Sequence, residues 1–172
     1  MADDPLRRLL DAAVEGDDRA LAELVRLTQP AVWRLCASLG SPGREDDLTQ
    51  DTYLRAIRSL AGYRGDGSVL SWLLSIARRT CADDVRRRRR ERRLGSRLAL
   101  VRFDDPPAPT AVDELLAGLD PDRREAFVLT QVVGLAYAEA AEVIGCPIGT
   151  VRSRVARARA DLAAAVRAAD AG

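Results

Sequence analysis

The segment over residues 136–159 constrains the fold most, because two short amphipathic patterns flank one tight turn. The first pattern has an apolar face made of four residues, Ala140, Ala141, Val143 and Ile144. Gly145 supplies the turn, and Pro147 follows where the first turn of a helix tolerates a missing N–H. Apolar residues then recur at helical spacing, at Val151, Val155, Ala158 and Leu162. The segment therefore predicts two helices packed through these apolar faces.

The other face of the second helix is small, polar and basic, at Gly149, Thr150, Ser153, Ala156 and Arg157. Arg152 and Arg159 flank one edge of that face and Arg154 lies near the other. A helix with such an outer face, placed after a tight turn, suits insertion into the major groove of DNA. The pair of helices therefore predicts a DNA reader, a role that repressors, activators and other initiation proteins share.

The rest of the chain also predicts helices. Hydrophobic residues make up 47% of the 172 residues but aromatic residues only 4%, so the cores must be aliphatic. No segment alternates with a period of two, and apolar residues recur at helical spacing instead. We expect helices over 5–39 (two), 44–60, 69–93, 112–119 and 120–133. Residues 62–68 are glycine-rich and predict a loop, and residues 95–110 contain three of the eight prolines and predict a flexible linker. The expected fold is all-α, with two small helical domains over 1–94 and 111–172.

Positive charge is concentrated in one part of the chain, although the net charge is only +1. Residues 76–102 hold eleven arginines against three acids, and Arg86–Arg90 with Arg92 and Arg93 put seven arginines into eight positions. Their mutual repulsion would be relieved by a polyanion, although a solvated helix end is the alternative interpretation. The loop and Trp72 before this run are compatible with a grip on single-stranded DNA, but we expect Trp72 in the core.

A second surface is predicted on the helix over 44–60. Its inward face would hold Leu48, Thr52, Tyr53, Ala56, Ile57 and Leu60, and its outward face Asp47, Gln50, Asp51, Leu54 and Arg58. Leu54 then lies among charged residues, a mixture that is typical of protein-docking surfaces. A surface helix with one stray leucine is an equally good interpretation of this pattern alone.

The sequence argues against catalysis and against a metal site. Histidine is absent, and so is a phosphate-binding loop of the G-x-x-x-x-G-K type, so we expect neither an enzyme nor a cofactor. Cys36, Cys81 and Cys146 are far apart in the chain and predict reduced thiols rather than a disulfide framework. The helical acids Asp46, Asp47 and Asp51 would make a poor metal cage. With an acidic N-terminus that lacks a long apolar run, the chain is expected to be cytoplasmic.

Three motifs, in this order, resemble those of one family. They are DLTQDTY at 47–53, WLLSIAR at 72–78 with Asp83, Arg86 and Arg87, and a C-terminal group made of GLAY at 134–137, Ala140-Ala141, GTVRSR at 149–154 and ARAR at 156–159. The chain resembles the extracytoplasmic-function (group IV) sigma factors of bacterial RNA polymerase over essentially its whole length. The resemblance implies sigma region 2 over 1–94, a linker over 95–110 and sigma region 4 over 111–172.

The resemblance also implies partners and site residues. Core RNA polymerase would be bound through its β′ clamp helices and its β subunit, with Asp47, Gln50, Asp51 and Leu54 in contact. The unstacked −10 strand of promoter DNA would be captured by Arg64, Asp66, Ser68, Arg78, Arg79, Asp83, Arg86 and Arg87. The −35 duplex would be read by Thr150, Arg152, Ser153, Arg157 and Arg159. Family members are commonly held inactive by an anti-sigma factor, which is a further expected partner.

One position departs from the family pattern. Arg79 stands where many members carry asparagine, so the −10 base preference of this chain would differ. The alternative function is a stand-alone helix-turn-helix regulator whose N-terminal half dimerises. Tight, specific DNA binding by an isolated dimer would favour that alternative, whereas a sigma factor binds core polymerase as a monomer. A helical adaptor would leave Arg152, Ser153 and Arg157 without a role.

Overall fold

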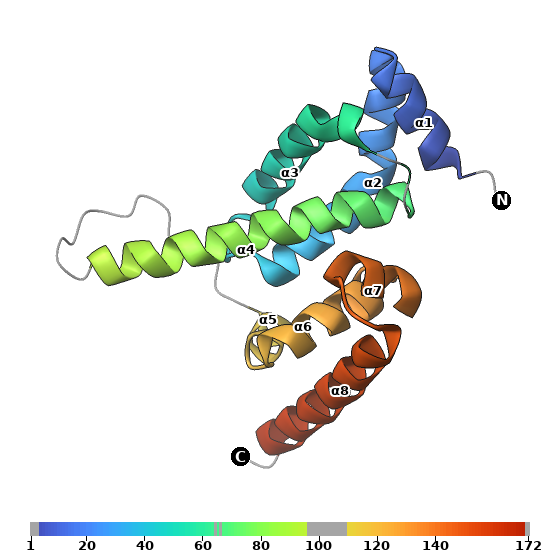
Figure 1. The fold of residues 1–172 in the computed structure, drawn as a ribbon. Helices are drawn as coiled ribbons and strands as arrows, with labels where there is room; N and C mark the ends of the chain where they lie inside the picture. Colours follow the sequence, from blue (N-terminus) through green and yellow to red (C-terminus); the bar gives the residue numbers. More distant parts are fainter. Residues whose placement is uncertain (1–3, 64, 66, 96–109, 171–172) are drawn as a thin grey trace.

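The computed structural model describes residues 4–63, 65, 67–95 and 110–170, which form helices and connecting turns without a strand. The N-terminal group comprises α1 (Pro5–Val14), α2 (Asp18–Leu39), α3 (Glu45–Ser59), the short 3₁₀ helix η1 (Leu60–Gly62) and α4 (Val69–Gly95). The C-terminal group comprises α5 (Ala111–Ala117), α6 (Pro121–Phe127), the π-helical turn η2 (Val128–Val132), α7 (Tyr137–Ile144) and α8 (Ile148–Asp170) (Figure 1). The predicted all-α fold is confirmed.

Side-chain caps explain where several helices begin. Asp17 Oδ1 accepts the backbone N–H groups of Arg19 and Ala20 at 2.8 and 3.2 Å, at the start of α2. Thr110 and Asp113 form a reciprocal capping box at the start of α5. Such caps satisfy N–H groups that have no partner within the helix, and each stabilises the helix by about 1 kcal/mol. Polar residues before the apolar pattern therefore set the start of these helices.

The N-terminal group packs around α2, which contacts α1, α3 and α4. Its core is aliphatic, as the composition predicts, and Val32, Leu35 and Leu74 are completely buried there. The hydroxyl groups of Thr28 and Tyr53 lie 2.8 Å apart and join α2 to α3 inside this packing. This contact holds α3 against α2.

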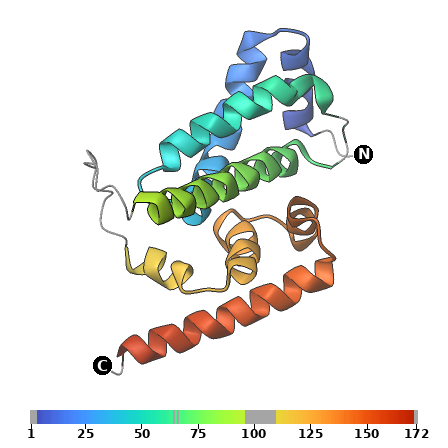
Figure 2. The ribbon, with the colours of Figure 1, turned by 60° about the vertical axis from the view of Figure 1, so that its left-hand side comes forward.

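The C-terminal group packs on α8, with Val151 and Val155 buried beneath α6 and α7. The core of one group continues into that of the other, since α7 packs on α4 and η2 packs on α2. In Figure 2, α4 lies between the other N-terminal helices and the C-terminal group. Among the described residues, the two helical groups thus form one continuous body.

Two expectations from the sequence need comment. The helix expected over 120–133 leaves α-helical geometry at Val128 and ends as a π turn. The linker expected over 95–110 falls, apart from its two end residues, outside the described residues. No helix in the described part of the chain combines the length and apolarity that a membrane crossing requires.

Candidate functional surfaces

The pair formed by α7 and α8 has the geometry that the sequence predicts. Gly145 ends α7 with φ +77°, a left-handed conformation that glycine adopts without strain. The N–H groups of Gly145 and Cys146 donate to the carbonyl of Ala141 at 2.8 and 3.1 Å. The carbonyl of Pro147 then accepts the N–H of Thr150 at 2.9 Å, so Pro147 lies just before α8 rather than inside it. The turn fixes the angle at which α8 leaves α7.

The outward face of α8 separates its arginines into two kinds. Arg152 and Arg157 are exposed and make no ion pair with any residue that the structure describes. Arg154 is instead held by the carboxylate of Asp122 and lies 3.9 Å from the sulfur of Cys146. Arg159 donates to Gln131 Oε1 at 2.6 Å. Arg152 and Arg157 therefore keep all their donors available for a ligand.

Two hydroxyl groups predicted for the −35 surface lie beside these arginines. Ser153 is exposed and its Oγ donates to the carbonyl of Thr150 at 2.9 Å. Thr150 itself is half-buried at the start of α8. The residues that the sequence assigns to DNA contact thus lie in the first half of α8, from Thr150 to Arg159.

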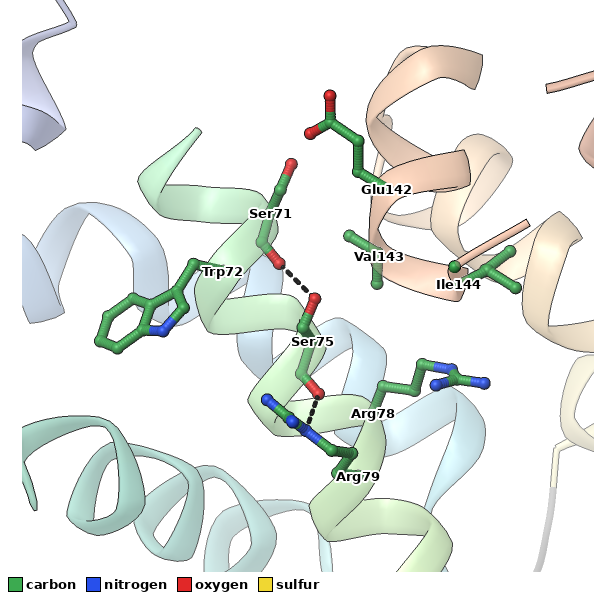
Figure 3. A pocket seen from close by; sticks show the side chains of 9 residues that line it. Ser71, Trp72, Ser75, Arg78, Arg79, Glu142, Val143 and Ile144 are labelled. Atoms are coloured by element: carbon green, nitrogen blue, oxygen red, sulfur yellow. Dashed lines mark hydrogen bonds between the residues drawn. The ribbon is translucent and has the colours of Figure 1, made fainter. Parts of the chain in front are cut away.

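The side chains predicted to bind the −10 strand lie along α4 and in the segment just before it. Ser68 Oγ accepts the N–H of Ser71 at 3.0 Å, so this hydroxyl stabilises the start of the helix. Arg79 is exposed, and its Nε donates to the carbonyl of Ser75 at 3.1 Å. Arg78 points the other way and pairs with Glu125 of α6 (Figure 3). Arg64 and Asp66 lie outside the described residues.

An ion-pair chain joins α3 to the middle of α4. Asp51 pairs with Arg55 at 3.1 Å, Arg55 with Asp83 at 3.0 Å, and Asp83 with Arg86 at 2.7 Å. The hydrogen bonds from Arg86 and Arg55 hold the pKa of Asp83 below its usual range. Asp83 therefore orients two arginines on the α3–α4 surface.

Asp84 is a functional candidate that the sequence analysis missed. Its side chain is only 2% exposed, and it pairs with Arg87 at 2.7 Å and with Arg44 at 3.8 Å. Burial opposes its ionisation, but hydrogen bonds from Ser41 and Arg87 leave its pKa below the ordinary value. The spacing of three residues between Asp84 and Arg87 could have indicated this helical pair. Asp84 thus orients Arg87 near the start of the arginine-rich segment of α4.

Beyond Val85, α4 buries no side chain that the structure describes, and its remaining length extends past the other N-terminal helices (Figures 1 and 2). Arg89, Arg90 and Arg92 are exposed there. Apolar burial does not account for this part of the helix, so its arginine-rich surface is available to an anionic partner.

The outer face of α3 carries the predicted docking residues. Asp47 and Gln50 are exposed, Asp51 is half-buried and Leu54 is 48% exposed. Ile57 was expected to face inward, but it is 43% exposed, because α2 and α4 cover α3 from two directions and leave this edge free. With Trp33 of α2, Leu54 and Ile57 line a groove of about 350 Å³. Sequence analysis missed Trp33, whose Nε1 donates to Asp46 Oδ1 at 2.8 Å.

Trp72 is half-buried rather than fully in the core. Its ring packs against Tyr63 with centroids 5.1 Å apart, and the Arg7 guanidinium lies 5.3 Å from the Tyr63 ring centre. Figure 3 shows the indole on the opposite side of α4 from α7. Tyr63 thus lies between Trp72 of α4 and Arg7 of α1 and links the two helices.

Comparisons with known proteins identify the family of both helical groups. The family described as sigma-70 region 2 matches residues 24–91, and sigma-70 region 4 matches residues 110–162. A probable RNA polymerase sigma-C factor from Mycobacterium bovis is 43% identical over 164 residues, which cover 91% of this chain and 89% of that protein. The chain belongs to the extracytoplasmic-function sigma factors.

Two solved structures match the described fold as a whole. CnrH, solved in complex with the cytosolic domain of CnrY, has a TM-score of 0.78 and 33% identity, covering 96% of this chain and 99% of that chain. The sigma factor RpoE of Bartonella quintana, in complex with the anti-sigma factor NepR, has a TM-score of 0.72 and 28% identity, covering 86% and 96%. This sigma factor therefore shares its helical framework with both.

The cysteines of this sigma factor contribute no metal centre among the described residues. Cys36 and Cys81 are free thiols buried in the N-terminal core, and Cys146 is half-buried in the α7–α8 turn. The hydrogen bond with Cys36 and burial raise the pKa of Cys81. A buried thiol with a raised pKa is a poor nucleophile, so Cys81 serves the packing of the core.

Proposed function

We propose that this sigma factor binds core RNA polymerase and directs it to promoters through two separate grips on DNA. Region 2 would comprise residues 1–94, the linker residues 95–110 and region 4 residues 111–172. The observation that carries the proposal is that three surfaces occur together in one chain that matches both sigma regions. They are an α8 face with two arginines unpaired among the described residues, an arginine-lined α4 and an apolar groove on α3. A stand-alone regulator would use the first surface, and the third only as a contact between two copies.

Region 4 would read the −35 element as duplex. The first turns of α8 enter the major groove, where the planar guanidinium groups of Arg152 and Arg157 can each donate two hydrogen bonds to a guanine edge. Thr150 and Ser153 would approach the bases or the phosphates beside them. Arg159, which is held by Gln131, would contact the backbone at the end of the groove.

Region 2 would hold the −10 strand once its bases are unstacked. Extruding a base costs a few kcal/mol, which contacts to bases and phosphates must offset. Arg79, Arg86 and Arg87 line the exposed side of α4, and Asp83 and Asp84 keep two of them oriented. Because Arg79 replaces the family's commoner asparagine, the base accepted there would differ from that of most relatives.

Docking on core polymerase would use α3. The groove lined by Trp33, Leu54 and Ile57 accepts an apolar side chain of the β′ clamp helices, while Asp47, Gln50 and Asp51 face polar or basic groups at its rim. An apolar centre with a polar rim is the usual anatomy of a protein interface. The same surface would be open to an anti-sigma factor, the type of partner present in the RpoE complex.

This sigma factor would act by binding alone, without catalysing a reaction itself, and in the cytoplasm, where polymerase and promoters are found. In vitro transcription over a genomic DNA library, with core polymerase and with or without the chain, tests the proposal. New start sites that share upstream elements are expected only when the chain is present. Unchanged start sites, together with tight promoter binding by a dimer of the chain alone, would instead support the stand-alone regulator.

A further inference from the structure

Arg7 of α1 lies against the loop that precedes α4, the helix to which the proposed function assigns the −10 strand. α1 packs on both η1 and α4 (Figure 1). The central carbon of the Arg7 guanidinium lies 5.3 Å from the ring centre of Tyr63, and this ring in turn packs on Trp72. The electron-rich face of an aromatic ring attracts a cation at such a distance. Through Tyr63, α1 is thereby connected to the first turn of α4.

Gly65 provides the space that the guanidinium occupies. Its φ of +81° is a left-handed conformation that glycine adopts without strain. A Cβ added at Gly65 would lie 2.5 Å from Arg7 Nη1 and 3.2 Å from Nη2, so both terminal nitrogens lie over the backbone of this residue. In the sequence, Gly65 stands between Arg64 and Asp66, two residues predicted to contact the −10 strand. Arg7 therefore contacts the loop at the residue between two of its predicted DNA contacts.

Tyr63 also holds the loop from within. Its hydroxyl donates to the carbonyl of Gly67 at 2.9 Å. Gly67 is a second glycine with positive φ, at +85°. Glycines have more backbone conformations open to them than other residues, so a loop that contains two of them loses much conformational entropy when it is ordered. The contacts of Tyr63 and Arg7 favour one of these conformations.

Asp11, one turn further along α1, orients the guanidinium. Arg7 Nε donates to Oδ1 and Oδ2 of Asp11 at 2.9 and 3.1 Å. The hydrogen bond with Asp11 raises the pKa of Arg7, so the cation is retained. A carboxylate at this distance repels a phosphate group, which favours a contact of Arg7 with the loop over a contact with the strand itself. The side chain of Arg7 is 43% exposed, so a substitution there leaves the core intact.

We propose that Arg7 is a positioning residue for the −10 strand, acting through Tyr63 and Gly65 on the loop before α4. This inference rests on the proposed function of α4 and deepens it. The sigma-70 region 2 match covers residues 24–91, so Arg7 and the rest of α1 lie before it. An ordered loop loses less conformational entropy on binding than a disordered one, so the contact raises the affinity for the unpaired strand.

Substitutions at Arg7 in the full chain test this role. Arg7→Met removes the cation but keeps a long unbranched side chain, whereas Arg7→Lys keeps a cation beside Tyr63. Arg19→Met is the matched control, because Arg19 is an exposed arginine at the start of α2. Each variant is combined with core RNA polymerase. Fluorescence anisotropy then measures its binding to a labelled fork-junction DNA with an unpaired −10 strand, taken from a promoter mapped with the wild-type holoenzyme.

Arg7→Met is expected to weaken binding to the fork about two- to fivefold, the range of a cation–π contact at an exposed site. Arg7→Lys should restore most of this loss, and Arg19→Met should bind as the wild type does. In a Tyr63→Leu background, Arg7→Met should have no further effect, because the two residues act together. The dependence of log K on log salt should keep its slope in Arg7→Met, since only a lost phosphate contact would lower that slope, by about one.

Equal weakening by Arg19→Met would overturn the proposal, because it would reduce the effect to net charge. Undiminished fork binding by Arg7→Met, or a loss that persists in the Tyr63→Leu background, would overturn it as well. A lower salt slope would assign Arg7 to a direct phosphate contact and would also refute the positioning role. In each case, new start sites with the wild-type chain would continue to support the sigma-factor function, so the two failures are distinguishable.

Discussion

Replacing Arg152 or Arg157 by alanine separates the base-reading arginines of α8 from those that hold the fold. Both side chains are exposed and unpaired among the described residues, so each variant should change the free energy of unfolding by less than about 0.5 kcal/mol. In a promoter complex, a bidentate contact from either side chain is worth about 1–3 kcal/mol of discrimination. That range corresponds to an affinity loss of about 5- to 150-fold.

The assay is holoenzyme binding and run-off transcription on a promoter found by start-site mapping, with the −35 element intact or scrambled. Arg152→Ala and Arg157→Ala should weaken only the complex with the intact element. Arg154→Ala should behave differently, because its pair with Asp122 contributes up to about 1 kcal/mol of stability and no base contact. Arg167→Ala, at the distal end of α8, is the matched control. Full activity of both Arg152→Ala and Arg157→Ala would refute the assignment.

Three other perturbations test separate parts of the structure. Leu54→Ala should weaken binding to core polymerase about fivefold, measured by biolayer interferometry. Leu54 is 48% exposed, so docking would bury about half of its side chain and gain about half of the roughly 1.5–3 kcal/mol that full burial of a leucine contributes. Val112→Ala, at a residue 62% exposed in the C-terminal group, should have no effect, and equal losses would contradict the groove. Leu129→Ala should lower the free energy of unfolding by about 2–5 kcal/mol in denaturant titration, because this side chain is completely buried; a loss below 1 kcal/mol would contradict the packing of η2. Asp84→Asn should lower the melting temperature at neutral pH. Because the pKa of Asp84 is depressed below its ordinary 3.8, its contribution is present above that pH and disappears on acidification through the folded-state pKa, so the two melting curves should converge there. A constant difference across that range would argue against an ionised Asp84.

Local structure was largely predictable from the sequence, because caps, prolines and apolar spacing act over a few residues. The turn at Gly145 and the buried stripe of Val151 and Val155 follow from spacing alone. The π turn at Val128–Val132 did not follow, since a single wide turn leaves the spacing of apolar residues almost unchanged.

Surfaces that depend on contacts between distant segments were harder to predict. A helical wheel put Ile57 inward, but only the packing of α2 and α4 decides which edge of α3 stays open. The pair between Arg78 and Glu125 joins residues 47 positions apart, and no local pattern indicates it. Periodicity shows that a helix has an apolar face, but it does not show which other helix covers that face.

The most direct test of the central claim has two steps. The full chain is mixed with core RNA polymerase and the complex is separated by density-gradient sedimentation, which gives its stoichiometry. The transcription start sites used by that complex are then mapped. The account predicts a one-to-one complex that initiates at a distinct set of sites sharing −35 and −10 elements. The account would be contradicted if the chain formed a dimer, did not bind core polymerase and left the pattern of start sites unchanged.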